Sequence, residues 1–77
     1  MKTLEEFVTL FAEQFDETEP SVFSGEKNFR EVDEWSSLIA LSVIAMVDEE
    51  FGVTLKGDDI KNSNTVEDIY NAVKAKL

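Results

Sequence analysis

The amino-acid sequence predicts an all-α fold, a bundle of three main helices and one short helix with a long first loop. Three segments repeat apolar residues at helical spacing, start and stop signals bound them, and the longest connection shows no strand pattern. The 77 residues are expected to form one domain, residues 1–77. Because the chain has no cysteine, packed apolar helix faces must supply its stability.

The first helix is expected from Leu4 to about Asp16. Thr3 is a suitable N-cap, and Glu6, three residues later, completes a capping box. Pro20 and its neighbours cannot continue the helix. The apolar stripe consists of Leu4, Phe7, Val8, Phe11 and Phe15.

Residues 17–35 are expected to form a long connection without a strand. A connection of this length in a compact domain is usually functional or held by its own apolar residues. We expect Phe29 and Trp35 in particular to fold back onto the core. The full apolar set is Val22, Phe23, Phe29, Val32 and Trp35.

The second helix is predicted from about Ser37 to Phe51, with Gly52 at its C-terminal cap. Its core stripe is predicted to be Ala40, Val43, Ile44, Val47 and Phe51. Other apolar residues then lie on or beside the outward face: Leu38, Ile39, Leu41, Ala45 and Met46. Either they form a docking patch, or Ile39 and Leu41 pack under the long loop against Trp35.

The last third of the chain is expected to carry Leu55 inward and then to make one short helical turn within residues 57–62, anchored by Ile60. A third main helix begins after Thr65, with Asp68 three residues on as its capping partner. The predicted core stripe of this helix is Val66, Ile69, Tyr70, Val73 and Leu77.

The charge balance limits the classes of partner. Seven basic and seventeen acidic residues give a net charge of −10. This argues against nucleic acid and against anionic membrane surfaces, both of which are bound by basic patches. Basic protein partners are the natural complement, although the charge can also serve solubility alone. We expect a monomer, because like charges repel.

Catalysis, metal binding and membrane insertion are not expected. The chain has no histidine, the side chain best suited to general base work near neutral pH. Asp58 and Asp59 lack a calcium-loop pattern and are interpreted as a solvated acidic turn. The charge-free stretch of residues 36–47 is too short to span a bilayer. A cytoplasmic location is therefore expected.

Ser36 and Ser37, at the start of the second helix, carry the most informative chemistry. The backbone N–H groups and dipole at a helix N-terminus favour negative charge, so a phosphate ester there is stabilised. Ser36 is well placed as the N-cap, which leaves the Ser37 hydroxyl free at the first helical position. The alternative is that both serines merely start the helix.

The order of these features resembles the acyl carrier proteins, over essentially the whole chain. The matching residues are Ser37-Leu38 at the start of the second helix, residues 48–53 (DEEFGV) at its end, and residues 65–69 (TVEDI). The resemblance implies a four-helix bundle that carries 4′-phosphopantetheine on Ser37, attached from coenzyme A by a phosphopantetheinyl transferase. It implies acyl groups held as thioesters and presented to acyl- or aminoacyl-loading and acyl-transferring enzymes. The alternatives are an aminoacyl or peptidyl carrier, or an unmodified interaction module that keeps the carrier fold.

The sequence departs from the family pattern in two places. Ser36 replaces the family's aspartate, which by resemblance helps the transferase recognise its substrate. Ile39 and Ser42 stand where the family places acids for partner docking. These departures favour a specialised carrier of a lipid or secondary-metabolite pathway over a general fatty-acid carrier. The predicted docking residues are Ser36, Leu38, Ile39, Leu41, Ala45, Asp48, Glu49, Asp58 and Asp59.

Overall fold

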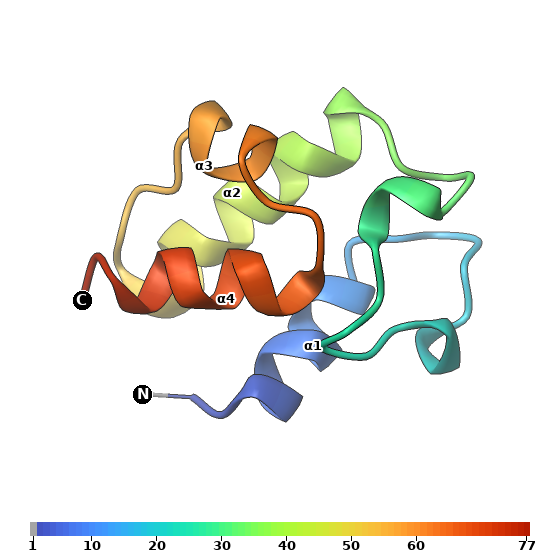
Figure 1. The fold of residues 1–77 in the computed structure, drawn as a ribbon, viewed down its shortest axis with the longest axis horizontal. Coiled ribbons are helices and arrows are strands. Elements are labelled where there is room, and N and C mark those ends of the chain that lie inside the picture. The colour runs from blue at the N-terminus through green and yellow to red at the C-terminus, as the bar shows by residue number, and fades with distance from the viewer. Residues whose placement is uncertain (1) are drawn as a thin grey trace.

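The computed structural model describes residues 2–77 and shows a small bundle of helices (Figure 1). The elements in chain order are α1 (Leu4–Ala12), two 3₁₀ turns (Pro20–Val22 and Phe29–Glu31), α2 (Ser37–Phe51), α3 (Gly57–Lys61) and α4 (Val66–Lys74). No strand occurs within residues 2–77, where β pairing is limited to the isolated bridge between Asn28 and Thr65. The predicted all-α bundle of three main helices and one short helix is confirmed.

The predicted helix starts agree with the structure. The Thr3 hydroxyl accepts the Glu6 N–H at 3.2 Å, and Glu6 Oε1 accepts the Thr3 N–H at 2.8 Å, which completes a capping box on α1. Thr65 and Asp68 form the corresponding box on α4. At the end of α2, Gly52 adopts a positive φ of 70°, the conformation that favours glycine at a C-cap.

The end of α1 was predicted too late: the helix stops at Ala12 and not near Asp16. The next amides make tight bonds to carbonyls three residues back, Gln14 N–H to Phe11 O and Phe15 N–H to Ala12 O. The amides of residues 16–18 donate to the side chain of Glu34 and leave the helical pattern. The ring of Phe15 nevertheless remains buried.

The core is built largely from aromatic rings. Phe7, Phe11 and Phe29 are fully buried, and the Phe11 ring lies 5.9 Å from the Phe29 ring. Trp35 is half-buried, with its ring centroid 4.5 Å from that of Phe29. The expectation that Phe29 and Trp35 fold back onto the core is confirmed, whereas Val22 is exposed.

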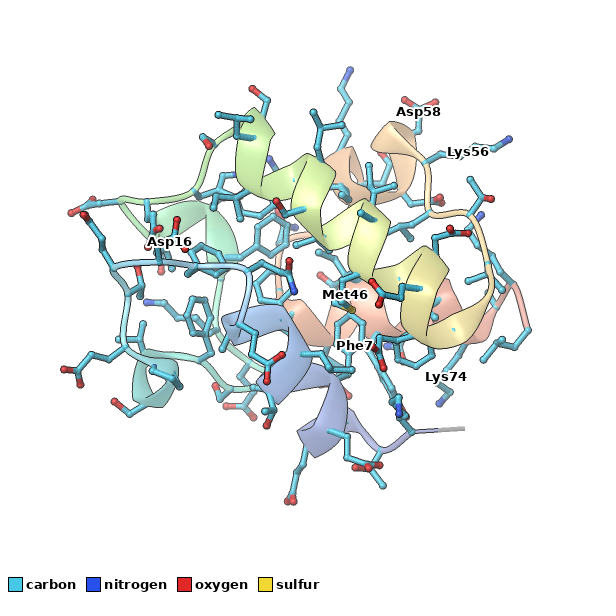
Figure 2. All side chains as sticks on the ribbon, turned by 180° about the vertical axis from the view of Figure 1, so that it is seen from behind. Phe7, Asp16, Met46, Lys56, Asp58 and Lys74 are labelled. Carbon is cyan, nitrogen blue, oxygen red and sulfur yellow. The ribbon has the colours of Figure 1, made fainter. Side chains whose placement is uncertain are left out.

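Two further burial predictions were wrong. Met46 was placed on or beside the outward face of α2, but it is buried and points into the core toward α1 (Figure 2). A helix that is apolar nearly all round does not reveal from spacing alone which flank a second helix covers. Leu77 was assigned to the core stripe, but α4 ends at Lys74 and Leu77 is 62% exposed.

Arg30 joins the long connection to the end of α3. Its guanidinium donates to the carbonyl oxygens of Ile60, Lys61 and Ser63 at 2.8–3.1 Å and lies over the Phe29 ring. Carbonyl groups at a helix C-terminus lack partners within the helix, so a cation there satisfies them. The connection is thereby fixed to the second half of the chain.

Candidate functional site

The N-terminus of α2 presents two serines in different roles. Ser36 is the N-cap: its hydroxyl accepts the Ile39 N–H at 3.4 Å. Ser37 is the first helical residue and is exposed. Within residues 2–77 its hydroxyl makes no hydrogen bond, so no contact inside the protein occupies it. The division of roles expected from the sequence is present in the structure.

The electrostatic setting of Ser37 suits a phosphodiester. The first turn of α2 contains no acidic residue, so nothing there offsets the positive end of the helix dipole. A negative group at such a helix end is stabilised by about 0.3–1 kcal/mol at an exposed position. The residues present therefore fit a phosphate-linked group on the Ser37 oxygen.

The exposed face of α2 continues from this serine. Residues four, eight and eleven positions after Ser37 are Leu41, Ala45 and Asp48, which share its side of the helix. All are exposed, Leu41 by 61%, and the adjacent Leu38 is exposed by 75%. Near Ser37 this face is therefore apolar.

Ile39 lies on a different side of α2. It is half-buried, packs against the core and lines a groove of about 530 Å³. The groove runs between the end of α1 and the first turns of α2, and three carboxylates but no basic side chain line it. The lining residues are Glu13, Gln14, Asp16, Glu34, Ser36, Leu38, Ile39 and Ser42.

The acids predicted for docking divide into two groups. Asp48 and Glu49 are exposed near the end of α2, and Asp58 is exposed at the start of α3 (Figure 2 labels Asp58). Eleven residues of helix place Asp48 about 16 Å along the axis from Ser37. Asp59 is engaged internally: its carboxylate accepts the Lys56 N–H at 2.8 Å and pairs with Lys76 at 3.2 Å. The Lys56 amide bond and the nearby Lys76 hold the pKa of Asp59 below its usual value despite some burial.

Glu34 is the residue whose role the sequence did not reveal. Its Oε2 atom accepts the Asp16 N–H at 2.7 Å. Its Oε1 atom accepts the Glu17 N–H at 3.0 Å, the Thr18 N–H at 2.9 Å and the Thr18 hydroxyl at 2.8 Å. Burial raises the pKa of Glu34, but these hydrogen bonds outweigh burial and hold the pKa below its usual value. No local pattern signals this contact, because 16–18 residues separate the partners.

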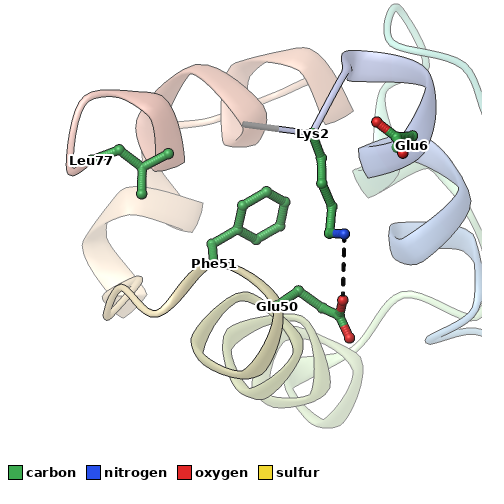
Figure 3. Close-up of a pocket in the computed structure, with 5 residues that line it drawn as sticks. All are labelled: Lys2, Glu6, Glu50, Phe51 and Leu77. Atoms are coloured by element: carbon green, nitrogen blue, oxygen red, sulfur yellow. Dashed lines mark ion pairs between the residues drawn. The ribbon is translucent and has the colours of Figure 1, made fainter.

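Another pocket lies at the opposite end of α2. It has a volume of about 470 Å³ and is lined by Lys2, Glu6, Glu50, Phe51 and Leu77 (Figure 3). Lys2 and Glu50 form an ion pair across it at 3.9 Å. This pocket is separated from Ser37 by the length of the helix and contains no nucleophilic hydroxyl. Among residues 2–77 no cluster of possible ligands for a metal ion occurs, and no helix is long and apolar enough to cross a membrane.

Comparison with known families agrees with this geometry. Residues 5–73 match the family described as the phosphopantetheine attachment site, and the chain belongs to that family. No curated protein and no solved structure matches the chain significantly. Domains of this family bear covalently attached 4′-phosphopantetheine, and they are generally carriers without catalytic activity. The chain is thus a phosphopantetheine-carrying protein of small helical-bundle fold.

Proposed function

Since the chain belongs to the phosphopantetheine attachment family, we propose that Ser37 bears the arm and that the protein carries acyl groups as thioesters between partner enzymes. One observation carries the proposal: the Ser37 hydroxyl is exposed at the start of α2, while Ser36 serves the backbone as N-cap. The bound arm supplies the thiol that the chain lacks, since it has no cysteine.

The attachment requires little of this chain. The Ser37 oxygen loses its proton and forms a phosphodiester bond as the pyrophosphate link of coenzyme A breaks, with the nucleotide part as leaving group. A phosphopantetheinyl transferase supplies the base and the metal ion for this transfer. The chain contributes an accessible hydroxyl, a helix end that favours the added negative charge, and a surface for the transferase.

The exposed face of α2 supports a particular kind of partner surface. Leu38 and Leu41 beside Ser37 fit an apolar patch, and Asp48 and Glu49 farther along fit basic side chains. Such a partner differs from one that reads acids at the helix start. This pattern favours a specialised lipid or secondary-metabolite pathway.

A second cargo class is favoured by the groove between α1 and α2. Carboxylates line it, and the sequence has no lysine or arginine between Lys2 and Lys27 or between Arg30 and Lys56. A thioester of an amino acid carries an ammonium group that this potential attracts. The mass of the acyl group released from protein isolated from its source distinguishes the cargoes, because an aminoacyl group contains nitrogen and a fatty acyl group does not.

The proposal is tested by intact mass after incubation with coenzyme A, Mg²⁺ and a broad-specificity phosphopantetheinyl transferase. The expected result is the addition of one phosphopantetheine per chain. No addition by several transferases, on protein shown by circular dichroism to be helical, would contradict a carrier that generic transferases modify. Only a dedicated transferase or an unmodified docking module would then remain.

A further inference from the structure

The start of α2 is less firmly capped than the starts of α1 and α4. Thr3 and Thr65 accept their capping N–H groups at 3.2 and 3.1 Å, and each has an acid three residues later that completes a capping box. The Ser36 bond is longer, at 3.4 Å, and residue 39 is isoleucine, so no reciprocal bond is possible. The orientation of the first turn of α2 must therefore depend on the residues that lead into it.

Those residues are held from two sides. The Glu34 carboxylate accepts four hydrogen bonds from residues 16–18, as described above. The next residue, Trp35, donates its N–H to Val32 O at 2.9 Å and packs its ring on Phe29 at 4.5 Å. Because the side chains of two consecutive residues are both held, the backbone that reaches Ser36 has little freedom left.

We propose that Glu34 is a positioning residue for the modification of Ser37. By binding the chain that follows α1, it fixes the approach to α2 and holds the serine hydroxyl in the orientation that a transferase requires. The inference rests on the proposed function of Ser37. Each Glu34 oxygen already accepts at least one hydrogen bond within the protein, so the side chain has a structural task besides its charge.

Loss of the Glu34 contact is expected to change the fraction of molecules that present Ser37 to the transferase. If the first turn of α2 frays when the contact is lost, only a fraction of molecules presents Ser37 correctly. The apparent affinity of the transferase then falls in proportion to that fraction, while the rate on the bound complex is preserved. The effect therefore appears in KM for the carrier and not in kcat.

The variants can be graded and matched in charge. Glu34→Gln keeps an acceptor for residues 17 and 18 but places an NH₂ group against the Asp16 N–H. Thr18→Val removes only the hydroxyl donor. Asp33→Asn is the control: it removes the same charge from the neighbouring residue, which is exposed and makes no side-chain hydrogen bond within residues 2–77.

The experiment measures initial rates of phosphopantetheine transfer over a range of carrier concentrations, together with amide hydrogen exchange. For Glu34→Gln we expect KM to rise by about three- to tenfold with kcat unchanged, and faster exchange both at residues 16–18 and in the first turn of α2. Thr18→Val should show a smaller rise in KM, and Asp33→Asn should match the unaltered protein.

Two results would overturn the inference. In the first, Glu34→Gln speeds exchange at residues 16–18 but leaves KM unchanged, which would make the contact merely structural. In the second, Asp33→Asn raises KM as much as Glu34→Gln, which would make the effect one of net charge. If the unaltered protein accepts no phosphopantetheine, it is the proposed function that fails, and the inference fails with it.

Discussion

The starts of α1 and α4 each have a reciprocal capping box, whereas the start of α2 has a single capping bond. In α1 and α4 a threonine and an acid three residues later satisfy the first amides reciprocally. In α2 a lone serine caps the helix, the first turn has no acid, and the support comes from Glu34 and Trp35 before the helix. In helices that only build the bundle, side chains of the first turn can cap the helix itself. In the helix that carries Ser37, the first turn has no such acid, and contacts of the residues before the helix hold it in place.

The largest effect is expected from removing the exposed hydroxyl of Ser37. Ser37→Ala should abolish phosphopantetheine addition, because no other serine occupies the first turn of α2 with a free hydroxyl. Ser36→Ala should still be modified, since it removes only the cap. Intact mass of both variants after the transferase reaction checks this prediction. Modification of Ser37→Ala at the normal rate would place the arm elsewhere.

The next effect concerns Phe29, which supports the starts of α2 and α4 together. Its ring packs under Trp35, and its N–H donates to Asn64 O at 3.3 Å. Phe29→Ala should lower the free energy of unfolding by about 3–5 kcal/mol, the usual cost of deleting a buried aromatic ring. Val22→Ala in the same connection is the control and should cost within about 0.5 kcal/mol, because Val22 is exposed. Urea denaturation measures both. Similar losses of unfolding free energy would show that the Phe29 ring is not what anchors the connection to the core.

A smaller effect compares the caps directly. Thr65→Ala should destabilise the protein by about 1 kcal/mol, the typical cost of losing an N-cap. Ser36→Ala should cost less, because its capping bond is longer and has no reciprocal partner. Urea denaturation of the two variants decides the order. An equal or larger loss for Ser36→Ala would contradict the account of a weakly capped α2.

The smallest effect is a pH dependence that the carboxylates at the three helix starts share. Hydrogen bonds from Thr3 lower the pKa of Glu6, those from Asn64 and Thr65 lower that of Asp68, and the contacts of Glu34 lower its pKa against burial. Because each folded pKa lies below the ordinary value of 4.5 for Glu or 3.8 for Asp, the stabilisation is complete above about pH 5 and is lost as the pH falls through the lowered values.

Nuclear magnetic resonance titration checks this dependence residue by residue. The amides of residues 16–18 should shift with the Glu34 carboxyl, and those at the start of α1 with Glu6. Titration of Glu34 at or above 4.5 would contradict the four hydrogen bonds assigned to it.

Local signals in the sequence predicted the helix starts, the bounds of α2 and the exposed serine. Capping boxes and a glycine in the left-handed region act within a few residues, so a pattern reveals them. The Glu34 contact and the bonds from Arg30 to the end of α3 join residues 16–33 positions apart, and no periodicity encodes them. The early end of α1 follows from the first of these contacts. Met46 escaped prediction because α2 is apolar on more than one flank.

The central claim is that Ser37, and not the capping Ser36, carries the arm. Fragmentation mass spectrometry of the modified peptide across the start of α2 distinguishes the two oxygens in the unaltered protein. The account predicts all of the phosphopantetheine on Ser37. Phosphopantetheine on Ser36 would contradict it, because the modified hydroxyl would then be the one assigned to capping α2.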